Sequence, residues 1–122
     1  MSDLGDRLSE LRLDHQERQK DIADMLHVTN ATVSNYETGT HLPPVDILCQ
    51  LADHFHVTTD YILGRTRCRI SADTLNQPFT NQLNYGELIE ILEKLPREKR
   101  DLLCALVHDM QISNYMKQRA QE

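Results

Sequence analysis

The 122-residue sequence contains no tryptophan and only two phenylalanines, so its core must be built mostly from aliphatic side chains. It also lacks a run of about 18 apolar residues, and we expect no transmembrane helix and no membrane partner. Its first residues contain no apolar block of the kind that a secretory signal needs. We therefore expect a cytoplasmic protein, with length enough for one compact domain and an appendage.

Cysteine is also scarce. The three cysteines are widely separated and form neither a disulfide framework nor a C-x-x-C pair, so we expect reduced thiols. A metal site built from Cys49, His54 and His56 is an alternative, but the segment CQLADHFH has the spacing of an ordinary amphipathic helix. We expect neither a metal nor a cofactor.

Positive charge is in short supply as well. The formal net charge is −6, with 7 basic and 11 acidic residues up to Arg69 and 6 and 8 after it. This balance argues against non-specific nucleic-acid binding, for which a basic surface is usual. It leaves sequence-specific recognition open, because groove fit and the local field count for more than total charge.

Catalytic motifs are missing too. The sequence has no glycine-rich phosphate loop and no H-E-x-x-H motif. Ser34 and His41 are close in sequence, but nothing indicates a triad. We expect that the protein is not an enzyme.

What is present is helical periodicity. The spacing of apolar residues predicts helices over about 3–14, 19–26 and 30–37, a fourth that opens at Pro43–Pro44, and a short fifth capped by Thr58. Thr29 and Gly39 suit the two ends of the third helix. The inward face of the fourth helix is expected to hold Val45, Leu48, Cys49, Ala52 and Phe55.

The second half of the chain differs. Residues 67–83 are rich in Ser, Thr, Asn, Gln and Pro without a sustained period, which predicts a linker. Residues 84–119 predict a hairpin of two helices that meet near Pro96. Its apolar side chains include Leu88, Leu92, Leu102, Leu103, Leu106, Val107 and Met110. Two helices cannot bury so wide a face alone, so we expect homodimerisation, with packing on the first domain or on another protein as alternatives.

The stretch TNATVSNYETG, residues 29–39, has helical spacing but contains few good helix formers. With Val33 and Tyr36 inward, a turn of 100° per residue puts short polar groups and one methyl on the outer face. Asparagine can bond adenine with two hydrogen bonds, hydroxyls can bond several base edges, and a methyl can contact that of thymine. The outer face therefore suits the major groove of DNA, and a merely solvated face is the alternative.

Several linked blocks resemble the lambda-repressor-like, or Cro-type, helix-turn-helix regulators, also called the xenobiotic-response-element family. The blocks are LR at 11–12, QKDIADML at 19–26, VTNATVSNYETG at 28–39, LPPVDILCQLADHFHV at 42–57 and TTDYILGR at 58–65. The resemblance implies a five-helix bundle that binds operator DNA as a dimer. We thus expect an all-α chain with a DNA-binding domain at 1–66, a linker at 67–83 and a two-helix oligomerisation segment at 84–119.

The resemblance also implies roles for single positions. The base-reading residues would be Asn30, Ala31, Thr32 and Asn35, with Ser34 beside them. It implies phosphate contacts for Gln19, Thr38, Thr40 and His41, and Arg18, Lys20 and Thr29 are further phosphate-contacting candidates from their places near the helix starts. Arg12 and Glu37 would form an ion pair that ties the first helix to the end of the third.

Three features depart from the family pattern. His27 stands in the turn where glycine is usual, and a positive φ there would be strained. Arg18 stands where Thr or Ser would cap the second helix. Thr40 and His41 replace the usual Lys or Arg, so operator affinity is expected to be modest and to depend on pH.

These observations predict a sequence-specific transcriptional regulator, most simply a repressor that binds a pseudo-palindromic operator as a dimer. Its half-sites would lie about 34 Å apart, with the third helix in the major groove. The alternative is a protein-interaction module, such as an antitoxin whose C-terminal helices bind a partner protein. An unknown small-molecule or protein effector is possible in either case.

Overall fold

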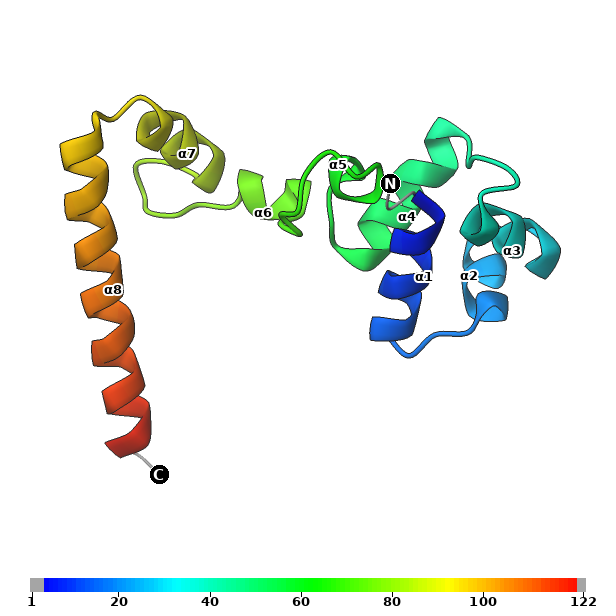
Figure 1. Cartoon of the computed structure of the whole chain (residues 1–122), viewed down its shortest axis with the longest axis horizontal. Coiled ribbons are helices and arrows are strands. Elements are labelled where there is room, and N and C mark those ends of the chain that lie inside the picture. The colour runs from blue at the N-terminus through cyan, green and yellow to red at the C-terminus, as the bar shows by residue number, and fades with distance from the viewer. Residues whose placement is uncertain (1–3, 121–122) are drawn as a thin grey trace. The chain divides into compact units, whose positions relative to one another are not determined.

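The computed structural model describes residues 4–120, and the all-α fold is confirmed in this range (Figure 1). The helices are α1 Leu4–Asp14, α2 Gln19–Leu26, α3 Asn30–Thr38, α4 Val45–Phe55, α5 Thr59–Ile62, α6 Ala72–Asn76, α7 Tyr85–Glu93 and α8 Arg97–Ala120. The chain divides into two compact units: unit 1 ends at Leu75 and unit 2 begins at Asn76. Between residues 4 and 120, no helix has both the length and the apolar character needed to cross a bilayer.

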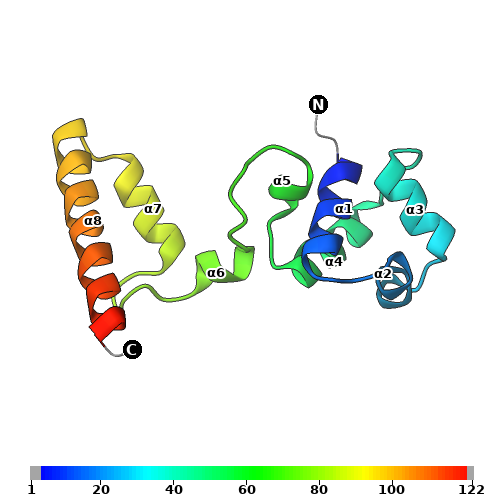
Figure 2. The same cartoon turned by 60° about the horizontal axis from the view of Figure 1, so that its bottom comes forward.

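Unit 1 has a mainly aliphatic core. In it α1 and α2 both pack against α3, as two views of the ribbon show (Figures 1 and 2), and α4 packs against α5. The buried side chains are Leu8, Leu11, Ile22, Ala23, Leu26, Val33, Tyr36, Leu51, Ala52, Phe55, Val57, Tyr61 and Ile62. Val33 and Tyr36 therefore point inward from α3, as their spacing predicts.

The turn between α2 and α3 is tight because His27 adopts the left-handed conformation, with φ 58°, which is the strained case that the sequence analysis considered for this position. The Oγ1 atom of Thr29 then accepts a hydrogen bond from the N–H of Thr32 at 3.1 Å, which caps α3. The same residue types, His-Val-Thr, recur at residues 56–58 after α4. There His56 has φ 55° and Thr58 caps α5 through the N–H of Tyr61 at 3.0 Å.

One expectation about α4 is wrong. Val45 is 78% exposed and Cys49 is exposed, whereas Leu51 is buried beside Ala52 and Phe55. The inward face is centred between Leu51 and Ala52. At 100° per residue, Cys49 lies roughly 110° from that centre. The true face is therefore rotated relative to the stripe that contains Val45 and Cys49.

Residues 67–83 contain more local structure than their composition predicts. The short helix α6 begins after Ser71, whose Oγ accepts from the N–H of Thr74 at 3.2 Å. Farther on, the N–H of Phe79 donates to the carbonyl of Leu83 at 3.0 Å, and the N–H of Tyr85 donates to that of Gln77 at 3.1 Å. These bonds come from turns and caps, which leave no apolar period in the sequence.

Unit 2 contains the two expected C-terminal helices. Asn84 and Glu87 form a reciprocal cap at the start of α7, with hydrogen bonds of 2.7 and 3.0 Å. An apolar groove of about 300 Å³ runs between α7 and α8 and is lined by Leu92, Leu103, Cys104, Val107 and Arg100. Most of the apolar surface of α8 is exposed, at Leu102, Leu106, Val107, Met110, Ile112, Tyr115 and Met116.

Candidate nucleic-acid interface

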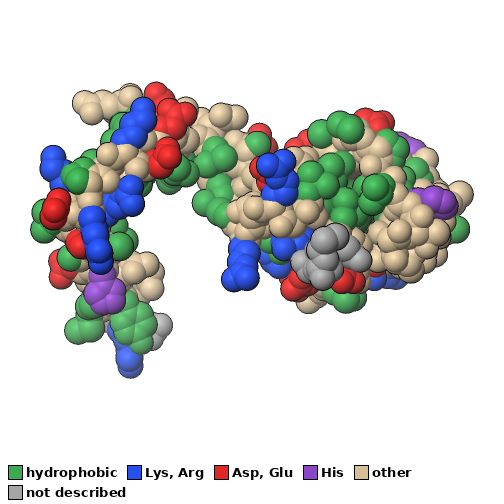
Figure 3. All heavy atoms as spheres, turned by 45° about the horizontal axis from the view of Figure 1, so that its top comes forward, with side chains coloured by type: hydrophobic (Ala, Val, Ile, Leu, Met, Phe, Trp, Pro, Cys, Tyr) green, Lys and Arg blue, Asp and Glu red, His purple; other side chains and the backbone are tan. Residues whose placement is uncertain are grey.

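The outer face of α3 carries the proposed base-reading residues. Asn30 and Ala31 are exposed in its first turn, and Thr32, Ser34 and Asn35 are half-buried. In the space-filling view, the end of unit 1 that contains α3 shows mostly uncharged surface, bordered by histidine (Figure 3). This surface is polar without being basic.

The side chains on this face differ in whether they already form hydrogen bonds within the protein. Thr32 shares a hydrogen bond of 2.8 Å with the hydroxyl of Thr29, so part of its capacity serves the cap of α3. Among the described residues, none forms a hydrogen bond with the side-chain amide of Asn30 or Asn35. These two amides are thus available to a ligand, which makes them the strongest candidates for base recognition.

The loop after α3 folds back on the end of the helix. Gly39 has φ 82°, and the carbonyl of Asn35 accepts from the N–H of His41 at 3.2 Å. The hydroxyls of Thr38 and Thr40 lie 2.8 Å apart, and Thr38 also donates to the carbonyl of Asn35 at 3.3 Å. The exposed Thr38, Thr40 and His41 are therefore held together next to the outer face of α3.

The start of α2 has an unexpected cap. The backbone N–H of Arg18 donates to Asp21 Oδ2 at 2.8 Å, and its guanidinium pairs with Asp21 Oδ1 at 3.1 Å. The side-chain hydrogen bond raises the pKa of Arg18 and lowers that of Asp21, to which the backbone bond also contributes. Asp21 thus makes the reverse bond of a capping box, from the third helical position to the N–H of residue 18, and does not replace the bond that Thr or Ser at position 18 would accept. Lys20 is exposed and Gln19 half-buried.

A partly buried ionic frame lies behind α3. Arg12 in α1 pairs with Glu37 through two short contacts, Nε–Oε2 at 2.9 Å and Nη2–Oε1 at 3.0 Å. Its third nitrogen, Nη1, donates to the carbonyl of Glu17 at 2.9 Å. The carboxylate of Glu17 in turn bonds His54 Nε2 of α4 at 2.8 Å. The frame joins α1, α3, α4 and the turn before α2, and sequence reasoning missed its Glu17–His54 half.

Gly5 is a second residue that the sequence analysis missed. It is buried in α1, where a Cβ would clash with the backbone carbonyl oxygen of Glu37 and lie 2.8 Å from the carbonyl carbon. A side chain at this position would therefore push α1 away from α3. Glycine at this position therefore lets α1 pack closely against the end of α3, and this contact sets the distance between the two helices.

The alternative metal site does not assemble. Cys49 is exposed, whereas His54 is engaged with Glu17. No cluster of three His, Cys, Asp or Glu side chains within residues 4–120 is placed to hold a metal ion.

The core behind α3 is closely packed. The cavity there, lined by Leu8, Val33 and Phe55 among others, has a volume of about 10 Å³.

Comparison with known proteins agrees with this geometry. Residues 8–62 match a family model described as helix-turn-helix. Over 62 residues the chain is 40% identical to the HTH-type transcriptional regulator ImmR of Bacillus subtilis (strain 168), covering 51% of this chain and 49% of that protein. Over 87 residues it is 31% identical to the SPbeta prophage-derived uncharacterized HTH-type transcriptional regulator YonR of the same organism, covering 70% of this chain and 81% of YonR.

A solved structure extends the likeness beyond the first unit. A transcriptional regulator from Listeria innocua is similar with a TM-score of 0.51 and 25% sequence identity, covering 89% of this chain and 92% of that one. The match to ImmR spans about half the length of that relative. The likeness is therefore strongest for the helix-turn-helix part.

Proposed function

Because the chain belongs to the helix-turn-helix transcriptional regulators, we propose that it is a repressor that binds a pseudo-palindromic operator as a homodimer, with α3 in the major groove. The observation that carries this proposal is the pair of unengaged amides, Asn30 and Asn35, on the outer face of α3. That face is presented by a helix whose other side is fixed by Val33, Tyr36 and the Arg12–Glu37 pair.

Phosphate contacts would surround this face. Thr38 ends α3, and Thr40 and His41 follow it. Arg18 precedes α2, and Gln19 and Lys20 are its first two residues. Only two of these six side chains are permanently cationic, and Arg18 already shares its charge with Asp21. We therefore expect few released counterions on binding, and a shallower salt dependence than basic regulators show.

The homodimer would form through unit 2. At 1.5 Å per residue, α7 is about 13 Å long and α8 about 36 Å, so α7 covers less than half of α8. The uncovered part still carries Ile112, Tyr115 and Met116, all more than half exposed. Covering such side chains is worth roughly 25 cal/mol per Å² of apolar surface, which favours association with a second copy.

The experiment that tests the proposal is a selection of bound sequences from random DNA duplexes, with the whole chain as bait. We expect an inverted repeat whose centres lie about one DNA turn apart. Asn30→Ala together with Asn35→Ala should lose this preference while the thermal unfolding midpoint is retained. The matched control is Asn81→Ala, an exposed asparagine of unit 2, which should select the same repeat as the wild type. Equal preference in the double variant would contradict the assigned role of α3.

A second candidate function is a protein-interaction module such as an antitoxin. It is favoured by the acidic balance of the chain and by the exposed apolar face of α8. Purified chain that enriches no DNA sequence, but forms a stable complex of defined stoichiometry with a second protein through α8, would support it over the repressor.

A further inference from the structure

The long helix α8 carries a row of exposed side chains at alternating intervals of four and three residues, which is the spacing of a coiled-coil seam. At 100° per residue, all of them lie within about 40° of one direction. The row extends over nearly the whole helix. We call it the α8 seam, and it consists of Asp101, Ala105, His108, Ile112, Tyr115 and Arg119.

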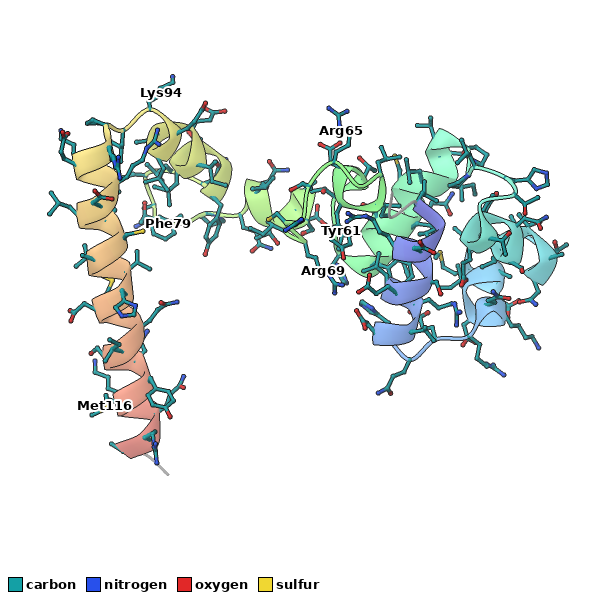
Figure 4. All side chains as sticks on the ribbon, in the orientation of Figure 1. Tyr61, Arg65, Arg69, Phe79, Lys94 and Met116 are labelled. Atoms are coloured by element: carbon teal, nitrogen blue, oxygen red, sulfur yellow. The ribbon has the colours of Figure 1, made fainter. Side chains whose placement is uncertain are left out.

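The α8 seam is separate from the two other apolar faces of the helix. At 100° per residue, Leu102 and Leu106 point roughly 120° away from it on one side. Leu103 and Val107, which line the groove beside α7, point roughly 140° away on the other side. Met116 lies next to the seam in the last turns of α8 (Figure 4). A helix that packs on the seam therefore leaves both the groove and the leucine-rich face free.

The order of side chains in the seam is complementary to its own reverse. An antiparallel pair of α8 helices with a two-fold axis at position 110 brings together residues that are equally far from that position. An acid then meets a base at each end, and a methyl group meets an aromatic ring between the ends and the centre. The residues that face each other in this way are Asp101 with Arg119, Ala105 with Tyr115, and His108 with Ile112.

Charge selects the antiparallel orientation. A parallel pair would place each Asp101 against its own copy and each Arg119 against its own copy, which is repulsive at both ends. No residue between 4 and 120 forms an ion pair with Asp101. Arg119 donates to the hydroxyl of Tyr115 at 3.3 Å and lies 5.8 Å from the centre of its ring, so this cation is held on the seam. The dipoles of antiparallel helices also attract each other.

We propose that the α8 seam binds the seam of a second copy in antiparallel orientation, as a contact separate from that of the proposed homodimer and weaker than it. Its large apolar side chains are only Ile112 and Tyr115, 51% and 56% exposed, so burial contributes less than at the leucine-rich face. The polar His108 in the seam lowers the stability of the contact and fixes its register.

Two homodimers joined by their seams form a tetramer. The tetramer carries four copies of α3, enough for two pseudo-palindromic operators. Its function rests on the proposed function, because it requires the homodimer and the operators. The seam contact itself needs no DNA.

Sedimentation equilibrium of the full chain over a series of concentrations tests the contact. The wild type should pass from dimer to tetramer as its concentration rises. Asp101→Arg and Arg119→Asp each put like charges opposite each other at both ends of the antiparallel pair. Each variant alone should therefore form tetramers about tenfold less readily. An equimolar mixture of the two variants brings acid against base again at both ends, and it should recover the tetramer of the wild type.

The matched control is Asp73→Arg, the same change of charge at an exposed aspartate of α6. It should sediment as the wild type does, and adding it to Arg119→Asp should not restore the tetramer as Asp101→Arg does. A wild type that stays a dimer at every concentration would overturn the inference. Tetramers of wild-type stability in both seam variants would also overturn it, as would a mixture that associates no better than the variants alone.

Failure of the seam contact is distinguishable from failure of the proposed function. A chain that selects the inverted repeat from random duplexes but never exceeds a dimer would overturn the seam contact alone. A chain that forms tetramers through the seam but selects no DNA sequence would support the contact and contradict the proposed repressor.

Discussion

The guanidinium of Arg12 and the carboxylate of Glu37 face each other in a bidentate pair whose side chains are only 15% and 8% exposed. The Arg12 group also donates to the carbonyl of Glu17, so three elements of unit 1 depend on one cation. Removing one partner of a buried pair leaves the other charge without compensation. The pair therefore matters more for the position of α3 than for its own net energy.

Glu37→Ala is expected to lower the free energy of unfolding by about 3–5 kcal/mol, because Arg12 is left buried without its counter-ion. Urea unfolding followed by circular dichroism measures this change. Glu10→Ala, at an exposed position of α1, is the control and should stay within about 0.5 kcal/mol of the wild type. A loss below about 1 kcal/mol in Glu37→Ala would mean that the pair is solvated and behaves like a surface ion pair.

Gly5→Ala is expected to be more damaging than its size suggests. The new Cβ would clash with the backbone of Glu37, which cannot rotate away as a side chain can. We expect a loss of about 3 kcal/mol or more, near the upper end for overpacking. Ser9→Ala in the same helix gives the comparison for an ordinary change in α1. Equal unfolding midpoints for Gly5→Ala and Ser9→Ala would show that α1 can shift without cost.

The sequence predicted the helices of unit 1 well because local signals mark their ends. Thr29 and Gly39 were identified as the ends of α3, and both act as predicted. The sequence alone did not decide whether His27 has a positive φ, and the structure shows that it does. The second His-Val-Thr turn, at residues 56–58, uses the same geometry and was not recognised as a repeat of the first.

Other features had no local signal. Glu17 and His54 are 37 positions apart, so their contact follows from the packing of α4 and not from any motif. The inward face of α4 was misplaced because two stripes of similar composition overlap on that helix, and only the neighbouring helices decide between them. Arg69 was assigned to a linker because the sequence around it is polar and shows no apolar periodicity. Single hydrogen bonds such as the one from Arg69 to Tyr61 order this segment, and they leave no such pattern in the sequence.

Asp21 gives a prediction about acid stability. Its pKa is lowered by the hydrogen bonds from the Arg18 side chain and then the Arg18 backbone, so folding favours the charged carboxylate. This contribution is fully present above the ordinary aspartate pKa, about 3.9, and is lost as the pH falls through the lower value of the folded state. Asp21→Asn should therefore unfold earlier than the wild type at pH 7, and the gap should close well below pH 4.

Thermal unfolding at a series of pH values measures this gap. Asp24→Asn, in the same helix but with no hydrogen bond between its side chain and Arg18, is the control and should change the midpoint little at either pH. A gap between Asp21→Asn and the wild type that stays constant from pH 7 to pH 2 would show that the mutation acts through packing and not through the charge of Asp21.

The proposed dimer predicts that polar changes on α8 act on association and not on folding. Leu102 and Leu106 are 71% and 49% exposed, so changing both to Glu leaves the folded chain intact while placing charges in the interface. Burial of a leucine is worth about 1.5–3 kcal/mol, so the dimer should weaken a hundredfold or more. Leu13→Glu, at an exposed leucine of unit 1, is the control. Sedimentation velocity would contradict the assignment if the α8 variant sediments as the wild type does.

His41 predicts how operator binding responds to pH. Histidine is the side chain that ordinarily gains a charge between pH 8 and pH 5, and His41 is exposed in the loop beside α3. A protonated His41 near phosphate would add an exposed ion pair worth up to about 1 kcal/mol, so affinity should be up to about fivefold higher at pH 6 than at pH 8. The slope of affinity against salt should also steepen by up to about one counterion at pH 6.

The control for this prediction is His41→Gln, which keeps a polar side chain that cannot be protonated. It should show neither effect, although the other histidines remain. Fluorescence anisotropy at both pH values measures this, and an equal pH response in His41→Gln and the wild type would assign the dependence to another group.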